Sequence, residues 1–313
     1  MPYERLVLVT RRTRLEELID RFNTRGQAKF YIEHAGGDFA DYEREHDAYR
    51  KALDRVRREL DLGLPLQVLD RPLVPTYTFG NQDVVVTLGQ DGLVANVAKY
   101  AGAQPIVGVN PDPERFDGVL LPFRPEEVNS IVTRVLNGKS RARRVTLAEA
   151  RLADGQRLLA FNDLFVGMRT HTSARYRIRA KDLQEAQSSS GVLISTGAGS
   201  TGWLSSVFNM AAGVTALAGG TTAAGFVFDW EDRRLVYVVR EPFVSKHSAA
   251  SVVAGLIEAG EEIVLESLVP SGAVIFSDGI ESDFLEFNAG AVSRVRASDQ
   301  QAVLVSDAPL PRR

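Results

Sequence analysis

The stretch Asp83-Val84-Val85-Val86-Thr87-Leu88-Gly89-Gln90-Asp91-Gly92-Leu93 joins an apolar run of strand length, a Gly-x-Asp-Gly turn and the start of an apolar helical pattern. A strand that leads through a glycine turn into a helix is a common phosphate-binding arrangement. Small residues let the backbone approach closely, and the free N–H groups at the helix start attract negative charge. The stretch therefore predicts a role in handling phosphate.

Asp91 places a carboxylate where the phosphates would lie. That carboxylate would repel an anion unless a metal ion or a proton transfer gives it a task. The alternative is an ordinary connection between a strand and a helix, in which Asp91 is a solvated N-cap.

The composition is that of a globular protein of 313 residues, long enough for one large domain or two typical ones. The formal net charge of -3 argues against nucleic acid or an anionic membrane as a partner. The chain has no cysteine, which excludes a disulfide framework, thiolate catalysis and a cysteine-type zinc site. Residues 1–5 lack a signal-peptide profile, and no window reaches the roughly 18 apolar residues needed to cross a bilayer. We therefore expect a cytoplasmic protein.

The first part of the chain alternates strand-like and helix-like patterns, which favours a parallel sheet with helices on its faces. In such sheets ligands gather at the carboxyl ends of the strands, where the Gly89–Gly92 turn falls. We predict strands at residues 6–10, 66–69, 82–88, 105–109 and 119–121, and helices at residues 13–22, 41–60, 93–101 and 125–136.

Beyond residues 137–141 the pattern changes to short strands, with one helix expected at residues 201–212. This favours an antiparallel β domain. The predicted fold is thus an α/β N-terminal domain with a parallel sheet, residues 1–140, followed by a β-rich, sandwich-like C-terminal domain, residues 141–293. Residues 294–313 could pack back onto the first domain. The strands expected in the second domain are residues 157–161, 164–166, 176–179, 192–195, 235–239, 263–266 and 274–277.

Three later stretches carry side chains suited to binding. Asn162-Asp163 offers hydrogen-bond donors and acceptors together, which suits sugar hydroxyls, although a β-turn is the commoner reason for such a pair. Residues 195–203, Ser-Thr-Gly-Ala-Gly-Ser-Thr-Gly-Trp, put hydroxyls and glycines between a strand and a helix, without the Gly-Lys-Ser/Thr ending of a P-loop. Asp278-Gly279 follows a strand, and a hairpin turn is its ordinary interpretation. The four histidines lack the spacing of metal ligands.

These four stretches, in this order, resemble the NAD kinase family. That family carries a Gly-Gly-Asp-Gly turn, an Asn-Glu pair, a Thr-Gly-Ser-Thr loop and a late Asp-Gly. The resemblance spans about residues 80–305, and its family fold agrees with the patterns above. It is closest to the mitochondrial-type branch, whose own segments look like residues 109–115, 189–191, 240–242 and 287–291.

The resemblance implies an ATP-dependent NAD kinase, which transfers a phosphoryl group from ATP to the 2′-hydroxyl of the adenosine ribose of NAD and gives NADP. Asp91 would be the general base or the group that orients this hydroxyl. A carboxylate is a weak base, so positioning and charge neutralisation by Mg²⁺ must supply much of the catalysis. The Mg²⁺ would be carried by the nucleotide phosphates, with no direct protein ligand.

The resemblance also implies the remaining site residues and the assembly. The second domain would bind the dinucleotide. Members of the family tend to build their sites from more than one subunit, so we expect a homodimer or a larger homo-oligomer. The residues implied for phosphate or nucleotide are Gly89, Gln90, Gly92 and Asp278, and those implied for NAD are Asn162, Asp163, Thr201, Gly202, Trp203 and Ser206.

Four positions depart from the family pattern. Gln90 replaces a glycine, which would cost activity if the position needs a positive φ; with an extended backbone its amide could donate to phosphate. Leu93 replaces a threonine and removes a hydroxyl. Asp163 is shorter than the usual glutamate by about 1.5 Å, roughly one C–C bond. Trp203 replaces a tyrosine and keeps a stacking face.

These departures leave two other functions open. One is a kinase of the same superfamily that acts on a sugar or lipid hydroxyl. The other is a non-catalytic dinucleotide-binding sensor. The sequence also leaves open whether the donor is ATP or polyphosphate and whether the acceptor is NAD or NADH.

Overall fold

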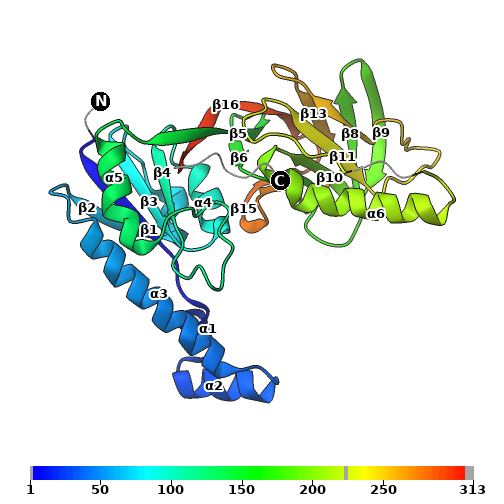
Figure 1. The fold of residues 1–313 in the computed structure, drawn as a ribbon. Coiled ribbons are helices and arrows are strands. Elements are labelled where there is room, and N and C mark those ends of the chain that lie inside the picture. Colours follow the sequence, from blue (N-terminus) through cyan, green and yellow to red (C-terminus); the bar gives the residue numbers. More distant parts are fainter. Residues whose placement is uncertain (1–2, 222–224, 307–313) are drawn as a thin grey trace. The chain divides into compact units, whose positions relative to one another are not determined.

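A computed structural model describes residues 3–221 and 225–306 (Figure 1). The chain forms two compact units: it leaves the first between residues 143 and 144 and returns to it between residues 302 and 303. The first unit is α/β and the second is β-rich, which confirms the predicted fold class. Within the two described ranges, no helix is both long and apolar enough to cross a bilayer.

The first unit is built on a parallel sheet with the strand order β2-β1-β3-β4, and the end of β16 joins it alongside β4. Every residue of β3 and β4 is buried, as expected of apolar runs covered on both faces. Helices α3 and α5 supply the apolar side chains that cover one face. The strands are β1 (Arg5–Thr10), β2 (Leu66–Asp70), β3 (Asp83–Leu88), β4 (Pro105–Val109) and β16 (Val292–Ser306), and the helices are α1 (Arg14–Phe22), α2 (Arg25–His34), α3 (Phe39–Glu59), η1 (Arg71–Thr76), α4 (Asp91–Ala98), η2 (Pro125–Glu127) and α5 (Val128–Leu136).

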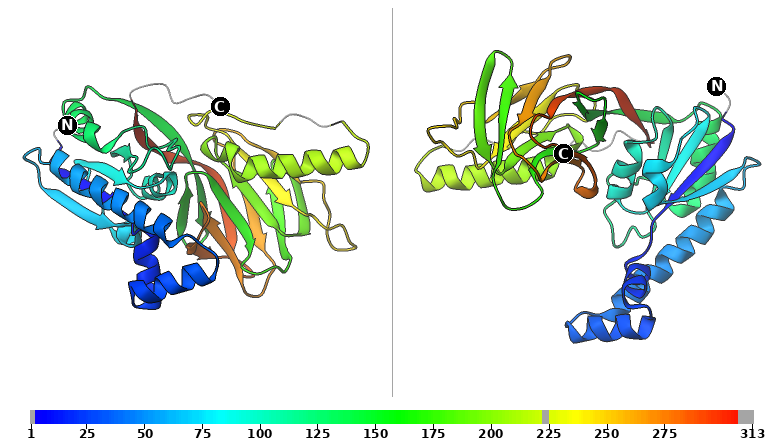
Figure 2. Two further views of the ribbon diagram at one scale, coloured as in Figure 1. Left: turned by 60° about the horizontal axis from the view of Figure 1, so that its bottom comes forward. Right: turned by 180° about the vertical axis from the view of Figure 1, so that it is seen from behind.

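Local capping signals decide where the first helix begins. Thr13 accepts a hydrogen bond from the backbone N–H of Glu16, and the Glu16 carboxylate accepts one from the backbone N–H of Thr13, so this is a capping box. Helix α2 was not expected from the sequence. It lies beside α1 and the start of α3 (Figure 2). The three helices share a small apolar cluster that includes Leu15, Ile32 and Phe39.

The strand predicted at residues 119–121 is wrong. These residues form a turn in which the backbone N–H of Leu121 donates to the carbonyl oxygen of Gly118. Gly118 has a φ of 61°, which favours glycine and breaks the extended backbone that a strand needs. The run Val119-Leu120-Leu121 is apolar because Leu120 and Leu121 are buried.

The second unit is a sandwich of two antiparallel layers. One layer has the order β16-β13-β8-β9, with β5 pairing both β16 and β6, and the other has the order β12-β11-β10-β7-β14-β15. The shared core draws alternate residues from both layers. The strands are β5 (Arg141–Leu152), β6 (Arg157–Ala160), β7 (Asp163–Met168), β8 (Ala174–Ala180), β9 (Leu183–Ser189), β10 (Gly191–Ser195), β11 (Leu235–Arg240), β12 (Ala254–Ile257), β13 (Ile263–Ser267), β14 (Ala273–Ser277) and β15 (Ile280–Glu286).

Helix α6 (Trp203–Leu217) covers the outer face of the second layer, after the short helix η3 (Ala198–Thr201). The alternation of β10 explains both contacts. Val192 and Ile194 point into the sandwich core, whereas Leu193 packs with Leu204 of α6. The strand thus fixes the loop that follows it against two packed surfaces.

Candidate functional site

The Gly-x-Asp-Gly turn joins the buried end of β3 to the first turn of α4. Gln90 is the N-cap and has φ -109° and ψ 168°, an extended backbone that any residue adopts. The side chain of Gln90 is exposed. A glutamine therefore fits here without backbone strain, and this position does not need a positive φ. That the Gln90 amide donates to phosphate stays a prediction.

The two glycines of the turn differ in what surrounds them. A methyl group on Gly89 would lie 2.8 Å from Leu93 Cδ2, whereas one on Gly92 would meet no atom within 4 Å. An alanine at residue 89 would thus have to displace the Leu93 side chain, whereas Gly92 keeps the surface of the helix start open. Leu93 is 2% exposed, so this position contributes to the core.

Asp91 is held in place by a backbone group far along the chain. Its Oδ1 accepts a hydrogen bond of 2.7 Å from the backbone N–H of Leu120. Leu120 approaches closely because Gly108 of β4 has no side chain: a Cβ there would lie 2.1 Å from the Leu120 carbonyl oxygen. The turn at residues 118–121 therefore fixes the orientation of the Asp91 carboxylate.

In the second unit, Asp278 organises the turn that carries Asn162 and Asp163. The Asp278 carboxylate accepts from the backbone N–H groups of Phe161 at 3.0 Å, Asn162 at 2.6 Å and Asp163 at 3.3 Å. The backbone N–H of Asp278 donates to the carbonyl oxygen of Asp163 at 2.9 Å. Asp278 thus positions the turn, and a direct contact between Asp278 and a ligand stays a prediction.

Asp163 is a buried carboxyl group with an unmet acceptor. It is 8% exposed, and among the described residues its Oδ1 has no hydrogen-bond partner. Burial raises the pKa of Asp163 to about 7; the Ser195 hydroxyl lowers it in part, and the Asp278 carboxylate raises it further. A hydroxyl group placed against this oxygen would supply the missing donor.

The loop at residues 195–202 uses most of its hydroxyls for its own structure. Thr196 Oγ1 donates to the Phe161 carbonyl oxygen at 2.6 Å, and Ser200 Oγ donates to the Gly197 carbonyl oxygen at 2.7 Å. Both side chains are fully buried, so they are not at hand for a ligand as the sequence suggested. The exposed residues of the loop are Thr201 and Gly202.

The Ser195–Gly202 loop also packs tightly on the Asn162 turn. A methyl group on Gly199 would lie 2.3 Å from the Asn162 carbonyl oxygen. The loop and the turn are therefore built as one unit, which brings Asn162, Asp163 and Asp278 beside the start of α6.

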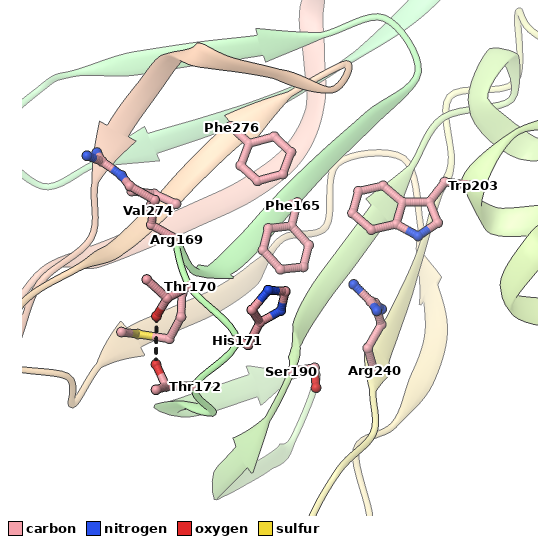
Figure 3. A pocket seen from close by; sticks show the side chains of 11 residues that line it. Phe165, Arg169, Thr170, His171, Thr172, Ser190, Trp203, Arg240, Val274 and Phe276 are labelled. Carbon is pink, nitrogen blue, oxygen red and sulfur yellow. Dashed lines mark hydrogen bonds between the residues drawn. The ribbon is translucent and has the colours of Figure 1, made fainter. Parts of the chain in front are cut away.

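Trp203 lines a cavity of about 340 Å³ on the second unit (Figure 3). Its ring stacks on Phe165 with centroids 5.4 Å apart, and the Arg240 guanidinium lies 5.4 Å from the Trp203 ring centroid. Ser206 does not line this cavity; it is exposed on α6, and its hydroxyl donates to the Gly202 carbonyl oxygen at 3.5 Å. The cavity is lined by Phe165, Met168, Arg169, Thr170, His171, Thr172, Ser190, Trp203, Arg240, Val274 and Phe276.

Sequence reasoning did not select Phe165 or Arg240 for the site. Phe165 had a usable signal, because it lies two residues after Asp163 on β7 and so points to the same face of the sheet. For Arg240 the sequence offered no signal beyond its place in a family-like segment. The pairing of β10 with β11 is what brings it beside Trp203. In the described part of the chain, no three carboxylate or imidazole side chains are grouped to hold a metal ion.

Comparison with known proteins gives a relative in sequence. An NAD kinase from Chlorobium phaeobacteroides (strain BS1) is 29% identical over 126 residues, which cover 39% of this chain and 43% of that protein. The match thus spans less than half of the relative's length. No known family profile matches the sequence.

Two solved structures share the fold over almost the whole chain. The crystal structure of yeast NADH kinase complexed with NADH has a TM-score of 0.58 and 16% identity, and the match covers 98% of this chain and 84% of that one. An NAD kinase from Archaeoglobus fulgidus in complex with ATP has a TM-score of 0.53 and 16% identity, covering 97% and 94%. The chain thus shares the overall fold of these two solved structures.

Proposed function

We propose that this chain, which has the fold of NAD kinases, is itself an ATP-dependent NAD kinase. The observation that carries the proposal is the Asp91 carboxylate. It lies in the Gly-x-Asp-Gly turn at the first residue of α4, and the backbone N–H of Leu120 orients it. The related NAD kinase sequence and the shared fold support the same activity.

In the proposed reaction the 2′-oxygen of the adenosine ribose attacks the γ-phosphorus of ATP. The bond between that phosphorus and the β,γ-bridging oxygen breaks, and ADP leaves. Asp91 Oδ1 already accepts from Leu120, so Oδ2 is the oxygen that would take the hydroxyl proton or orient the hydroxyl. The N–H groups at the start of α4 would bind donor phosphate beside Gly89, Gln90 and Gly92.

For the acceptor, we propose that NAD binds to the second unit. The unpartnered Oδ1 of Asp163 would accept from a ribose hydroxyl, and the Asn162 amide would donate or accept beside it. The exposed Thr201 and Gly202, with Trp203 and Ser206, would line the adenine, ribose and nicotinamide positions. Asp278 would act mainly by holding the turn.

The finer assignments rest on the resemblance alone. We propose that the chain belongs to the mitochondrial-type branch, acts as a homodimer or larger homo-oligomer, and uses Mg²⁺ that enters with the nucleotide. A cytoplasmic location stays a prediction. Kinases of this kind need a divalent ion to neutralise phosphate charge.

The test is formation of NADP from NAD with ATP and Mg²⁺, with polyphosphate in a parallel reaction. Asp91→Asn should lower turnover by about 10²–10⁴-fold, the usual contribution of a general base. Asp61→Asn, an exposed carboxylate after α3, is the matched control and should be unaffected. If Asp91→Asn were as active as wild type, the assignment of Asp91 as the general base would be wrong. NAD binding without turnover would favour a sensor, and turnover of a sugar or lipid alcohol alone would favour the other kinase.

A further inference from the structure

The sheet of the first unit has a switch point between β1 and β3. The chain leaves β1 toward β2 on one side, and it leaves β3 toward β4 on the other, because the order is β2-β1-β3-β4. In open parallel sheets, ligands bind outside the carboxyl ends of the strands at such a point. The residues that follow those two ends are Arg11 after β1 and Gly89 after β3.

Arg11 lies directly beside the Gly-x-Asp-Gly turn. A methyl group on Gly89 would be 3.5 Å from Arg11 Cδ, which is van der Waals contact. The side chain of Arg11 is 10% exposed. Arginine side chains usually lie in solvent, so the burial of Arg11 beside this turn calls for a structural or functional explanation.

The Arg11 side chain is fixed by two hydrogen bonds and an aromatic ring. Its Nη2 donates to Glu45 Oε1 at 2.9 Å, and its Nη1 donates to the Arg12 carbonyl oxygen at 3.0 Å. The Tyr49 ring lies 5.1 Å from the guanidinium carbon. The Tyr49 hydroxyl accepts from the Arg11 backbone N–H at 2.9 Å and donates to the Leu88 carbonyl oxygen at 3.1 Å. Tyr49 thus couples Arg11 to the end of β3.

In the described part of the chain, one nitrogen of the Arg11 guanidinium makes no hydrogen bond. Within the described residues, Nε is buried and has no hydrogen-bond partner. Leaving a buried charged donor without an acceptor is costly, so it is rare in a folded protein unless a ligand or water completes it. An anion at the turn would provide that acceptor.

The charged groups around Arg11 form a network of shared ion pairs. Glu45 is shared by Arg11 and Arg14, and Asp41 is shared by Arg14 and Arg115. Burial alone would raise the pKa of Glu45, but hydrogen bonds from Arg14 and Arg11 outweigh it and keep the pKa below its ordinary value. Hydrogen bonds from Arg115 and Arg14 likewise hold the pKa of Asp41 well below its ordinary value, so both carboxylates are ionised near neutral pH. Arg115 also pairs with Asp112 at 3.6 Å, so three guanidinium groups face three carboxylates. An anion would therefore be bound by the unpartnered Nε–H rather than by excess positive charge.

We propose that Arg11 binds a phosphate group of the phosphoryl donor at the Gly89–Asp91 turn through its Nε–H. The inference rests on the proposed kinase function, and it names a binding residue of that donor site in the first unit. The ligand chemistry is a chain of phosphates, which both a nucleoside triphosphate and inorganic polyphosphate offer. Arginine suits this task because its guanidinium stays charged and presents several donors in a fixed plane.

The experiment measures binding of two probes to the full chain by calorimetry: Mg²⁺ with a non-hydrolysable ATP analogue, and inorganic tripolyphosphate. Arg11→Met should raise the Kd of both probes by about ten- to a hundredfold, the effect of losing a charge-assisted hydrogen bond. The KM for NAD should change by less than about threefold, because NAD is assigned to other residues. A loss confined to the ATP analogue would overturn a phosphate contact.

Two further variants keep the test sharp. Arg12→Met removes the same charge from the next residue, which is exposed and pairs with Asp20, and should leave both Kd values near wild type. Arg11→Lys keeps a cation for Glu45 but removes Nε–H, so it should bind both probes several-fold more weakly even where Arg11→Met fails to fold. Wild-type affinity in Arg11→Lys and Arg11→Met, or equal losses in Arg12→Met, would overturn the inference. Arg11-dependent tripolyphosphate binding in a protein that makes no NADP would refute the proposed kinase activity and leave the Arg11 site standing.

Discussion

Replacing Asp163 by asparagine should remove a pH dependence from the stability of the second unit. Asp163 is 8% exposed, and burial raises its pKa to about 7 against an ordinary value of 3.8 in the unfolded chain. Between these values the folded protein keeps a proton that the unfolded chain has lost. Wild type therefore loses stability as pH rises through this range, and Asp163→Asn, which has no proton to lose there, does not.

The size of the effect follows from the two pKa values. Raising the pKa of Asp163 from 3.8 to about 7 corresponds to about 4 kcal/mol, at about 1.4 kcal/mol for each pH unit. The stabilisation is fully present below pH 3.8 and is lost by the time the pH has passed about 7. Between pH 5 and pH 8, wild type should lose about 3 kcal/mol of unfolding free energy relative to Asp163→Asn.

The assay is urea unfolding followed by tryptophan fluorescence at a series of pH values. Both tryptophans of the chain, Trp203 and Trp230, lie in the second unit, so the signal reports the unit that contains Asp163. Asp154→Asn is the matched control: Asp154 is exposed, and hydrogen bonds from Gln156 lower its pKa, so it does not titrate in this window. A constant difference between wild type and Asp163→Asn from pH 5 to pH 8 would refute a neutral buried carboxyl group.

Two further substitutions test how the Asn162 turn is built. Asp278→Asn should lower the unfolding free energy by about 2 kcal/mol, because an amide cannot replace both carboxylate oxygens that accept from the turn. Asparagine tolerates the φ of 54° at this position, so backbone strain does not add to the effect. An unchanged urea midpoint would contradict the role of Asp278. Gly199→Ala should cost about 1–3 kcal/mol, since its methyl would lie 2.3 Å from a backbone oxygen. Gly213→Ala in α6 meets no atom within 4 Å and should stabilise by up to about 1 kcal/mol, so similar effects of the two alanines would contradict the packing argument.

The sequence predicted the features that depend on near neighbours. The strand, turn and helix start at residues 83–93 are present, as is the helix start at Thr13, where the capping residues lie three apart. Helix α2 escaped prediction because its apolar residues do not mark a single buried face: Ala28 and Ile32 are buried, whereas Phe30 and Tyr31 are exposed. The strand expected at residues 119–121 failed because an apolar run looks the same in a buried turn as in a buried strand.

The candidate site residues also divide into those that a local sequence pattern could identify and those that only the tertiary structure brings together. The Gly-x-Asp-Gly turn could be selected from its pattern, but whether Gln90 was tolerable depended on a backbone angle that the sequence does not give. The many hydroxyl groups of residues 195–201 suggested ligand contacts. The hydroxyls of Thr196 and Ser200 instead donate hydrogen bonds to backbone carbonyl oxygens. Arg11, in a charged segment before α1, had no pattern to mark it.

By itself, the sequence determined the two fold types, the phosphate-type turn and the position of Asp91, because strand runs, glycine turns and helix starts are set by residues close together in the chain. Only the tertiary structure decided which side chains meet. Asp278 caps a turn more than a hundred residues earlier, and Arg11 packs beside Gly89 because β1 and β3 are neighbours in the sheet. Strand order and register create these contacts, and a local pattern contains neither.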